Sequence, residues 1–437
     1  MKKAIALTLS LLLAVALAAC SPPSDPTPPA SPAASPAPAG SEAAPSGDSA
    51  PAEGTTITYV TLGDTGMNQL QKAAEEFEAE TGIKVKLESW AYSDAYQKII
   101  TLCEAGTPPD AMYGFSGWTQ QFKNLGYTVP LDNLISQELK DDFSKAALDV
   151  CTVDGQMWVM PSYMSIRSIL YNKDMLDAAG ITQLPTTWQE FLEVAPKLAG
   201  DGKYAYSMVA GHPKNTLDCF LPILWAYDGD VTAADGKTNG FNNENGIAAL
   251  QVYCDLAKFA VPDYGEADIN FTQNNFTTQT AAAYIHNAQG LAALADAGED
   301  YSWAVVGAPL KGSGGSQYSL GIMDVDLVFN TGNEAAAGKW LEFWHTKDRM
   351  GDVVEQAGWV PNQKSFFDRP AFTDPANVMV APFAELEPLA KFKPTISSWE
   401  EVQKVMADYI TKAVMGEMTP AEAFAEAGPL VDELLQK

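Results

Sequence analysis

The chain has 437 residues and a formal net charge of −28 at pH 7, with 46% hydrophobic and 10% aromatic residues. A field of that sign repels phosphate backbones, which argues against nucleic acid as a partner, although salt screens exposed charges beyond about 10 Å. Four of the five cysteines are widely spaced without a Cys-x-x-Cys pair, so zinc-finger and thioredoxin-like sites are excluded.

Residues 1–20 have the pattern of an export signal. Lys2 and Lys3 precede an apolar run from Ala4 to Val15 that is too short to span a bilayer. The leader ends in Leu17-Ala18-Ala19-Cys20, which resembles the bacterial lipobox, in which the cysteine is diacylated and becomes the first mature residue. We therefore expect a signal peptide at 1–19, and a lipid on Cys20 as the only attachment to the membrane.

Residues 20–54 are predicted to be a disordered tether. They hold ten prolines among alanine, serine and a few acidic residues, with no aromatic or branched aliphatic side chain. Such a composition cannot bury a core, and an extended polyproline-type chain of this length reaches at most about 100 Å. No later apolar run has spanning length, so we expect a soluble domain on the outer face of the cytoplasmic membrane.

Strand-like and helical segments alternate after the tether. Residues 56–61 are strand-like, and residues 68–80 have helical apolar spacing that Gly82 stops. A second strand at 83–87 leads into another helix and, after Pro108-Pro109, into a strand at 111–113. This alternation predicts an α/β fold with a parallel, doubly wound sheet.

Three later helices have recognisable starts or faces. Thr187 with Glu190, and Thr419 with Glu422, fit the capping box, the second with proline at the first helical position. In the helix expected at 399–413, one face carries apolar side chains, which predicts core packing. Those side chains are Val402, Val405, Met406, Tyr409 and Ile410.

Residues suited to catalysis or metal binding are few. His212, His286 and His345 are scattered, so a histidine triad or metal centre has little material. We therefore expect no enzyme, no cofactor and no metal. Chance pairs among 55 acidic residues leave an extracellular carbohydrate-cleaving enzyme open as a remote alternative. Export permits a disulfide between Cys219 and Cys254, and buried free thiols are the alternative.

Aromatic residues occur near the ends of several predicted strands. In open α/β sheets, ligands bind beyond the carboxyl ends of the strands, and aromatic faces stack on sugar rings. Core packing is the alternative for each ring taken singly, but the set predicts a binding cleft. The set is Trp90, Tyr92, Phe115, Trp118, Tyr163, Trp225 and Trp359.

A series of short motifs, in a fixed order behind the lipobox, forms a recognisable pattern. Three of them are Phe77-Glu78-Ala79-Glu80-Thr81-Gly82, Gly106-Thr107-Pro108-Pro109-Asp110 and Leu170-Tyr171-Asn172-Lys173-Asp174. Over residues 55–437 the pattern resembles bacterial extracellular solute-binding proteins of ABC importers, family 1, in the carbohydrate-binding group related to maltose-binding protein.

The resemblance implies a two-lobed periplasmic-binding-protein fold of type II with a multi-crossing hinge. Lobe one is expected at 55–166 plus 305–345, and lobe two at 167–304 plus 346–437. The implied partners are a small-molecule solute, a sugar or oligosaccharide, trapped between the lobes of a monomer, and the permease subunits that receive it. A polyol phosphate, a nucleoside or an amino-acid derivative stays open as the solute.

The resemblance also implies ligand contacts at particular positions. Asp64 and Thr65 follow the first strand, where the family places polar contacts. Ser165 stands where maltose-binding protein has a carboxylate, and Asp218 stands where it has an aromatic ring. Together with the aromatic set, the implied ligand-binding residues are Asp64, Thr65, Ser165, Asp218, Asn287 and Gln289.

Two departures from the family pattern bear on the ligand. Asn287 and Gln289 occupy a loop that usually offers a tryptophan, and Asp218 introduces a charge. These changes make a maltodextrin less fitting and leave room for a smaller or more polar solute. Arg167, near the expected crossing between lobes, either clamps a carboxylate or phosphate of the ligand or forms a hinge salt bridge.

Overall fold

The computed structural model describes residues 54–436, apart from 93, 297–301, 375–376 and 378–379. The predicted signal peptide, the lipid site at Cys20 and all of the tether except Gly54 lie outside the described residues. Within the described part of the chain, no helix is both long and apolar enough to cross a membrane.

Strands and helices alternate through the described residues. The strands are β1 Thr56–Leu62, β2 Lys84–Trp90, β3 Ala111–Phe115, β4 Thr152–Val153, β5 Gln156–Met157, β6 Met160–Asn172, β7 Ala283–His286, β8 Ala304–Val306, β9 Ser319–Val328 and β10 Ala390–Phe392. The helices of the first half are α1 Met67–Thr81, α2 Ala95–Glu104, α3 Thr119–Asn124, α4 Gln137–Asp142, α5 Lys145–Cys151, α6 Lys173–Ala178, α7 Trp188–Leu198 and α8 Pro213–Ala226. The later helices are α9 Glu244–Ala257, α10 Ile269–Thr277, α11 Gln289–Asp296, α12 Glu334–Trp344, α13 Met350–Gln356, α14 Pro370–Thr373, α15 Ala381–Ala384, α16 Trp399–Val414 and α17 Pro420–Leu435.

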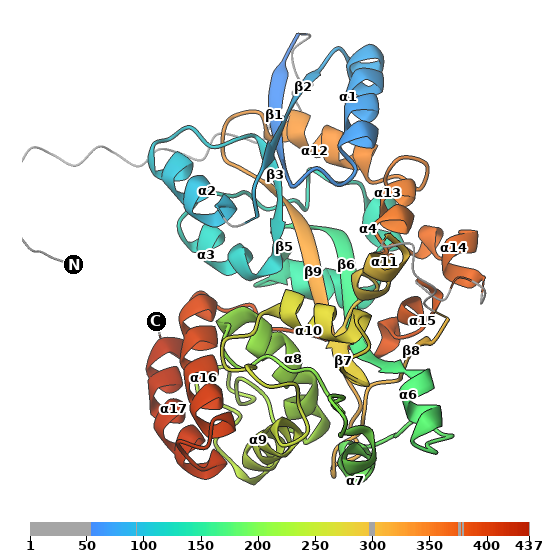
Figure 1. The fold of residues 1–437 in the computed structure, drawn as a ribbon. Coiled ribbons are helices and arrows are strands. Elements are labelled where there is room, and N and C mark those ends of the chain that lie inside the picture. Colours follow the sequence, from blue (N-terminus) through green and yellow to red (C-terminus); the bar gives the residue numbers. More distant parts are fainter. Residues whose placement is uncertain (1–53, 93, 297–301, 375–376, 378–379, 437) are drawn as a thin grey trace, which may run out of the picture. The chain divides into compact units, whose positions relative to one another are not determined.

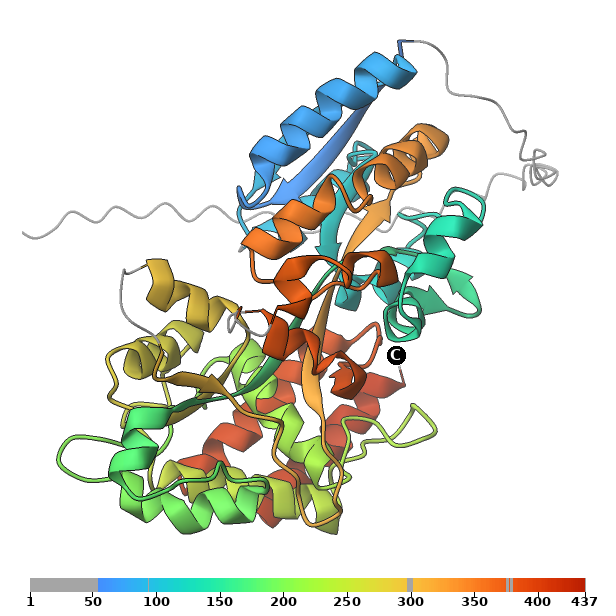
Figure 2. The same cartoon turned by 90° about the vertical axis from the view of Figure 1, so that its right-hand side faces the viewer.

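The strand–helix alternation predicted for the first 60 residues of the domain is confirmed. β1 pairs in parallel with both β2 and β3. Helices α1 and α12 lie to one side of these strands, and α2 and α3 lie to the other (Figure 1). In the turned view, α1 and α12 run beside the same strands (Figure 2). This is the doubly wound arrangement that the sequence predicts.

Two long strands connect the two halves of the described fold. The sheet order is β2-β1-β3-β9-β6-β7, and β6 and β9 are antiparallel. Figure 1 shows both strands running from the β1–β3 sheet toward β7, β8 and α8. Ser165 is paired with Ile322, and Arg167 with Leu320, so the crossing expected near Arg167 lies on this pair of strands.

Local signals account for several helix ends. Gly82 has a left-handed backbone with φ 73°, and its N–H donates to the carbonyl of Glu78, so it ends α1 as predicted. Thr419 and Glu422 form the complete capping box at α17. The box predicted at α7 is only half formed. Thr187 accepts the N–H of Glu190, but the Glu190 carboxylate accepts the N–H of Thr186 at 2.7 Å, one residue too early.

The buried apolar side chains form two clusters. The first core includes Tyr59 and Phe77, whose rings both contact Trp340 edge-on. The second core includes Phe220 and Phe424, which contact each other, and the predicted α16 face contributes its buried Val402, Met406 and Ile410. Val405 and Tyr409 are half-buried against the second core.

The two cores are not identical to the two predicted lobes. Met350, Val354 and Phe383 pack in the first core, although residues 346–437 are predicted as part of lobe two. The lobe boundaries stay a prediction.

The four cysteines in the described residues are free thiols. Cys219 and Cys254, the predicted disulfide candidates, are therefore not bonded to each other. The alternative prediction, free thiols, is confirmed. Burial raises the pKa of each of these two thiols to about 12. Neither side chain is a reactive thiolate at neutral pH.

Candidate functional site

A cleft of about 540 Å³ lies between side chains of the two cores. Tyr92 follows the carboxyl end of β2 and Phe115 ends β3, so the cleft lies where open α/β sheets bind ligands. Trp118 comes from the first core, and Trp399 from the second. The described lining residues are Tyr92, Tyr96, Phe115, Ser116, Gly117, Trp118, Lys214, Gly321, Ile322, Met323, Phe392, Lys393, Pro394, Thr395, Trp399, Glu400 and Gln403.

The three predicted site residues that line this cleft are aromatic and differ in exposure. Tyr92 is 48% exposed, Phe115 is half-buried, and Trp118 is only 7% exposed. Trp118 contacts Phe115 edge-on, with ring centroids 5.2 Å apart, and also packs against Tyr96 at 5.6 Å. A Cβ at Gly114 would stand 2.9 Å from the Trp118 ring, so glycine there allows the indole to approach β3. Tyr92 and Phe115 therefore offer the accessible ring surface, and Trp118 supports them.

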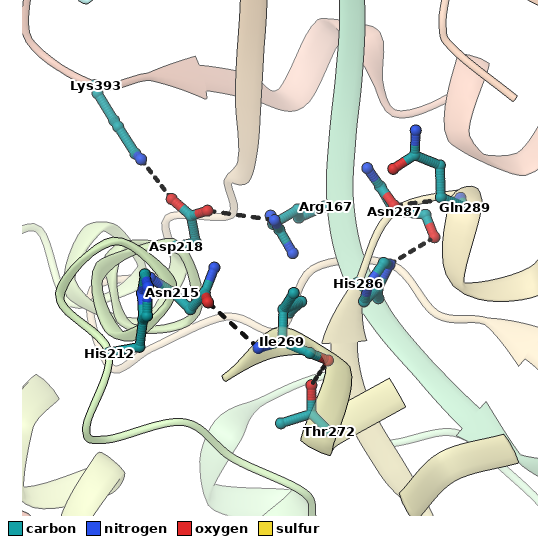
Figure 3. Close-up of polar contacts among 10 residues, drawn as sticks. All are labelled: Arg167, His212, Asn215, Asp218, Ile269, Thr272, His286, Asn287, Gln289 and Lys393. Carbon is teal, nitrogen blue, oxygen red and sulfur yellow. Dashed lines mark hydrogen bonds and ion pairs between the residues drawn. The ribbon is translucent and has the colours of Figure 1, made fainter. Parts of the chain in front are cut away.

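Asp218 lies next to the cleft without lining it. Its carboxylate is fully buried and is paired with Arg167 Nη2 at 3.2 Å and with Lys393 Nζ. Figure 3 shows the two cations approaching Asp218 from different sides. Burial raises the pKa of Asp218, but Lys393, Arg167 and Lys214 outweigh it, so the pKa lies below its ordinary value. Arg167 thus forms the salt bridge that the sequence left as one of two possibilities.

The start of α8 positions these charges. His212 caps the helix by accepting the N–H of Asn215, and Asn215 Oδ1 accepts the N–H of Ile269 at the start of α10. Figure 3 shows the contact between Asn215 and Ile269 near Asp218. Lys214 and Asp218 are four residues apart, so they share one face of α8. That face turns toward the cleft, since Lys214 lines it.

The loop after β7 holds two further predicted residues near Arg167. Asn287 is buried, and its Oδ1 accepts the N–H of Gln289, which is exposed. His286 precedes them, and its buried ring contacts the carbonyl of Asn287 (Figure 3). Burial, and then the charge of Arg167, lower the pKa of His286 to about 3, so this ring is neutral at physiological pH.

The other predicted site residues do not line the described cleft. Asp64 and Thr65 are exposed, and Asp64 accepts the hydroxyl of Ser89 at 2.9 Å. Ser165 is buried on β6 opposite Ile322, which does line the cleft. Tyr163 and Trp359 stack on each other with ring centroids 4.0 Å apart.

Trp90 and Trp225 have structural contacts of their own. Trp90 Nε1 donates to Glu88, and Lys98 Nζ lies 3.8 Å from the Trp90 ring centroid. Trp225 Nε1 donates to Asp230 at 3.0 Å within the second core. The alternative of core packing fits these two rings best.

Sequence reasoning missed a second buried carboxylate beside the cleft. Asp324 on β9 is paired in register with Phe115, and the hydroxyl of Tyr113 donates to its Oδ2 at 2.6 Å. Burial raises the pKa of Asp324 to about 7, although the Tyr113 hydrogen bond and the charge of Lys214 oppose the shift. Among the described residues, Asp324 Oδ1 has no hydrogen-bond partner.

The cations and the α16 residues of the cleft were also missed. Trp399 begins α16, and the apolar spacing of that helix predicted only core packing. Lys393 lies 175 positions after Asp218, and no local pattern signals their contact. The one usable signal was the spacing of Lys214 and Asp218, which places a cation and a carboxylate on one helix face.

A family model described as bacterial extracellular solute-binding protein matches residues 63–349. The chain belongs to this family. The family consists of binding proteins rather than enzymes, and the cleft between two cores is the feature expected of a solute-binding protein.

Individual members of the family are distant relatives. A putative binding protein of Brucella abortus (strain 2308) is 26% identical over 377 residues, covering 84% of this chain and 90% of the relative. The galactooligosaccharide-binding protein of Bacillus subtilis (strain 168) is 23% identical, covering 82% and 85%. The structure of the sugar-binding protein MalE from Xanthomonas citri matches with a TM-score of 0.78 at 20% identity, covering 87% of this chain and 98% of that one. This structural match shows that the solute-binding protein has the two-lobed fold of the maltose-binding type.

Proposed function

We propose that this solute-binding protein captures a sugar or oligosaccharide in the cleft and delivers it to the permease of an ABC importer. The observation that carries the proposal is the aromatic lining of the cleft, in which Tyr92 follows β2, Phe115 ends β3 and Trp399 comes from the second core. Aromatic faces stack on the apolar faces of sugar rings, and a ligand that contacts both sides favours the closed state. The similarity to a galactooligosaccharide-binding protein supports the same solute class.

The experiment is a thermal-shift screen with neutral and acidic mono- and oligosaccharides, followed by calorimetry on each hit. A ligand at a hundred times its dissociation constant stabilises the fold by about 2.7 kcal/mol, which raises the melting temperature measurably. We expect one sugar bound per chain, recovered chemically unchanged. A sugar recovered cleaved would favour the carbohydrate-cleaving alternative and contradict the proposal.

We further propose that the protein is anchored outside the cytoplasmic membrane by a lipid on Cys20. The support is the lipobox-like Leu17-Ala18-Ala19-Cys20 and the proline-rich residues that follow it. Replacing Cys20 with serine removes the acylation site, so Cys20→Ser should be recovered from the culture medium. Persistent membrane association of this variant after washing would contradict the anchor.

A further inference from the structure

Three positively charged side chains surround the single carboxylate of Asp218. Arg167 and Lys393 are both paired with Asp218, and Lys214 is close enough to lower its pKa as well. Two of these three cations, Lys214 and Lys393, line the cleft. This side of the cleft therefore carries an excess of positive charge in a chain whose net charge is −28.

Nearby groups do not neutralise that excess. His286 adds no charge, because burial lowers its pKa to about 3. The charge of Lys214 lowers the pKa of Asp324, but burial outweighs it and raises that pKa to about 7, so Asp324 is only partly ionised at neutral pH. Glu400 is the one acid among the described lining residues, and it is exposed and accepts a hydrogen bond from Gln403. Arg167 Nε and Nη1 also find no acceptor within the described part of the chain.

Both lysines lie over aromatic rings that line the same cleft. Lys214 Nζ is 5.1 Å from the ring centroid of Phe115, and Lys393 Nζ is 5.6 Å from that of Trp399. Each side of the cleft thus offers an apolar face and an ammonium group next to each other. The complementary ligand has a ring with an apolar face and an anionic substituent.

We propose that the solute is an acidic saccharide whose carboxylate or phosphate group binds between Lys214 and Lys393. The inference rests on the proposed function, since it narrows the class of sugar that the cleft takes. Charge-assisted hydrogen bonds to the two ammonium groups supply the selectivity, and the neighbouring rings supply the stacking surface.

The first test compares matched ligand pairs by calorimetry on the wild-type protein. The pairs are galacturonate and galactose, glucuronate and glucose, digalacturonate and galactobiose, and glucose 6-phosphate and glucose. We expect the acidic member of at least one pair to bind tenfold or more tightly than its neutral partner, with affinity falling as NaCl rises. The uronate and phosphate arms show which acidic group is preferred.

The second test removes one ammonium group at a time. Lys214→Met and Lys393→Met should weaken binding of the acidic sugar about 10- to 100-fold and leave its neutral partner nearly unchanged. Lys391→Met is the matched control, because Lys391 has the same charge but pairs with Asp230 and does not line the cleft. Lys214 is exposed, so Lys214→Met keeps the test valid even where Lys393→Met unfolds.

The outcomes separate this inference from the proposed function. Equal or tighter binding of the neutral members, or equal loss of both members in Lys214→Met, would overturn the acidic-saccharide inference while solute capture stands. If no member of any pair binds, the sugar-binding proposal fails together with it.

Discussion

Asp218 and Asp324 are both buried carboxylic acids beside the cleft, yet their pKa values shift in opposite directions. Asp218 on α8 is surrounded by Arg167, Lys214 and Lys393, which hold its pKa below the ordinary value. Asp324 on β9 has a hydrogen bond from Tyr113 and the more distant charge of Lys214, and burial raises its pKa to about 7. The comparison shows that burial alone favours the neutral acid and that compensating cations decide whether the charge persists.

The largest expected effect comes from removing the carboxylate on the α8 side. Asp218→Ala leaves the buried Arg167 and the partly exposed Lys393 without their shared partner, which should lower the free energy of unfolding by about 3–5 kcal/mol. Urea unfolding at pH 7 measures this loss. The control is Asp149→Ala, which removes the exposed Lys145 pair and should leave the midpoint unchanged. If both variants lost equally little free energy of unfolding, the ion pairs of Asp218 would contribute no more to stability than an exposed pair, which would contradict this prediction.

Trp118→Ala tests how much a buried, uncharged side chain of the cleft contributes to stability. The ring is 7% exposed and packs against Tyr96, Phe115 and Phe122. Its removal should cost about 3–5 kcal/mol in the free energy of unfolding of the unliganded protein. An unchanged melting temperature combined with a large loss of sugar affinity would instead assign Trp118 to ligand stacking.

Asp324→Asn tests the β9 side through pH. Because the folded protein holds the Asp324 proton more tightly than the unfolded chain does, wild-type stability should fall as pH rises from about 4 to about 7, by at most about 1.4 kcal/mol per pH unit. The asparagine variant lacks this contribution, so relative to wild type it should gain stability over the same range and keep the gain at pH 8. Thermal unfolding of both proteins at pH 5 and pH 8 measures the difference. A difference independent of pH would contradict the raised pKa.

Tyr92→Ala should have the smallest effect on stability. The ring is 48% exposed at the edge of the cleft and contacts Phe115 at 6.2 Å between centroids. We expect the free energy of unfolding to change by less than about 0.5 kcal/mol, while sugar affinity falls about 5- to 30-fold as stacking area is lost. Circular dichroism melting and calorimetry on one preparation measure both quantities. Full retention of affinity would remove Tyr92 from the binding surface.

The sequence predicted the local elements well because their determinants are near neighbours. Gly82 ends α1 through its own backbone conformation, and Thr419 caps α17 through a residue three positions away. The same reasoning failed by one residue at α7, where Glu190 accepts from Thr186 rather than from Thr187. Two neighbouring threonines offer backbone donors there, and Glu190 also accepts the hydroxyl of Thr186 at 2.8 Å, a second bond that favours Thr186.

The candidate site was predictable only in part. Tyr92, Phe115 and Trp118 were found because they follow parallel strands, whose carboxyl ends meet at one edge of the sheet. Lys393 and Trp399 were not found, because no pattern around them indicates that residues after β10 reach the same cleft. Trp225 was predicted to contact the ligand, but it packs in the second core, and its indole N–H donates to Asp230.

The sequence by itself predicted an export signal ending at Cys20, and it determined the strand–helix alternation after Thr56 and the family resemblance, since each depends on short-range order along the chain. Only the tertiary structure decided which charges meet. Asp218 keeps a low pKa because Lys393 and Arg167 reach it from the segment after β10 and from β6, while Asp324 forms no ion pair within the part of the chain that the structure describes. Electrostatic compensation of a buried group is a sum over spatial neighbours, and those neighbours are set by the packing of β6, α8 and β9 rather than by adjacency in the sequence.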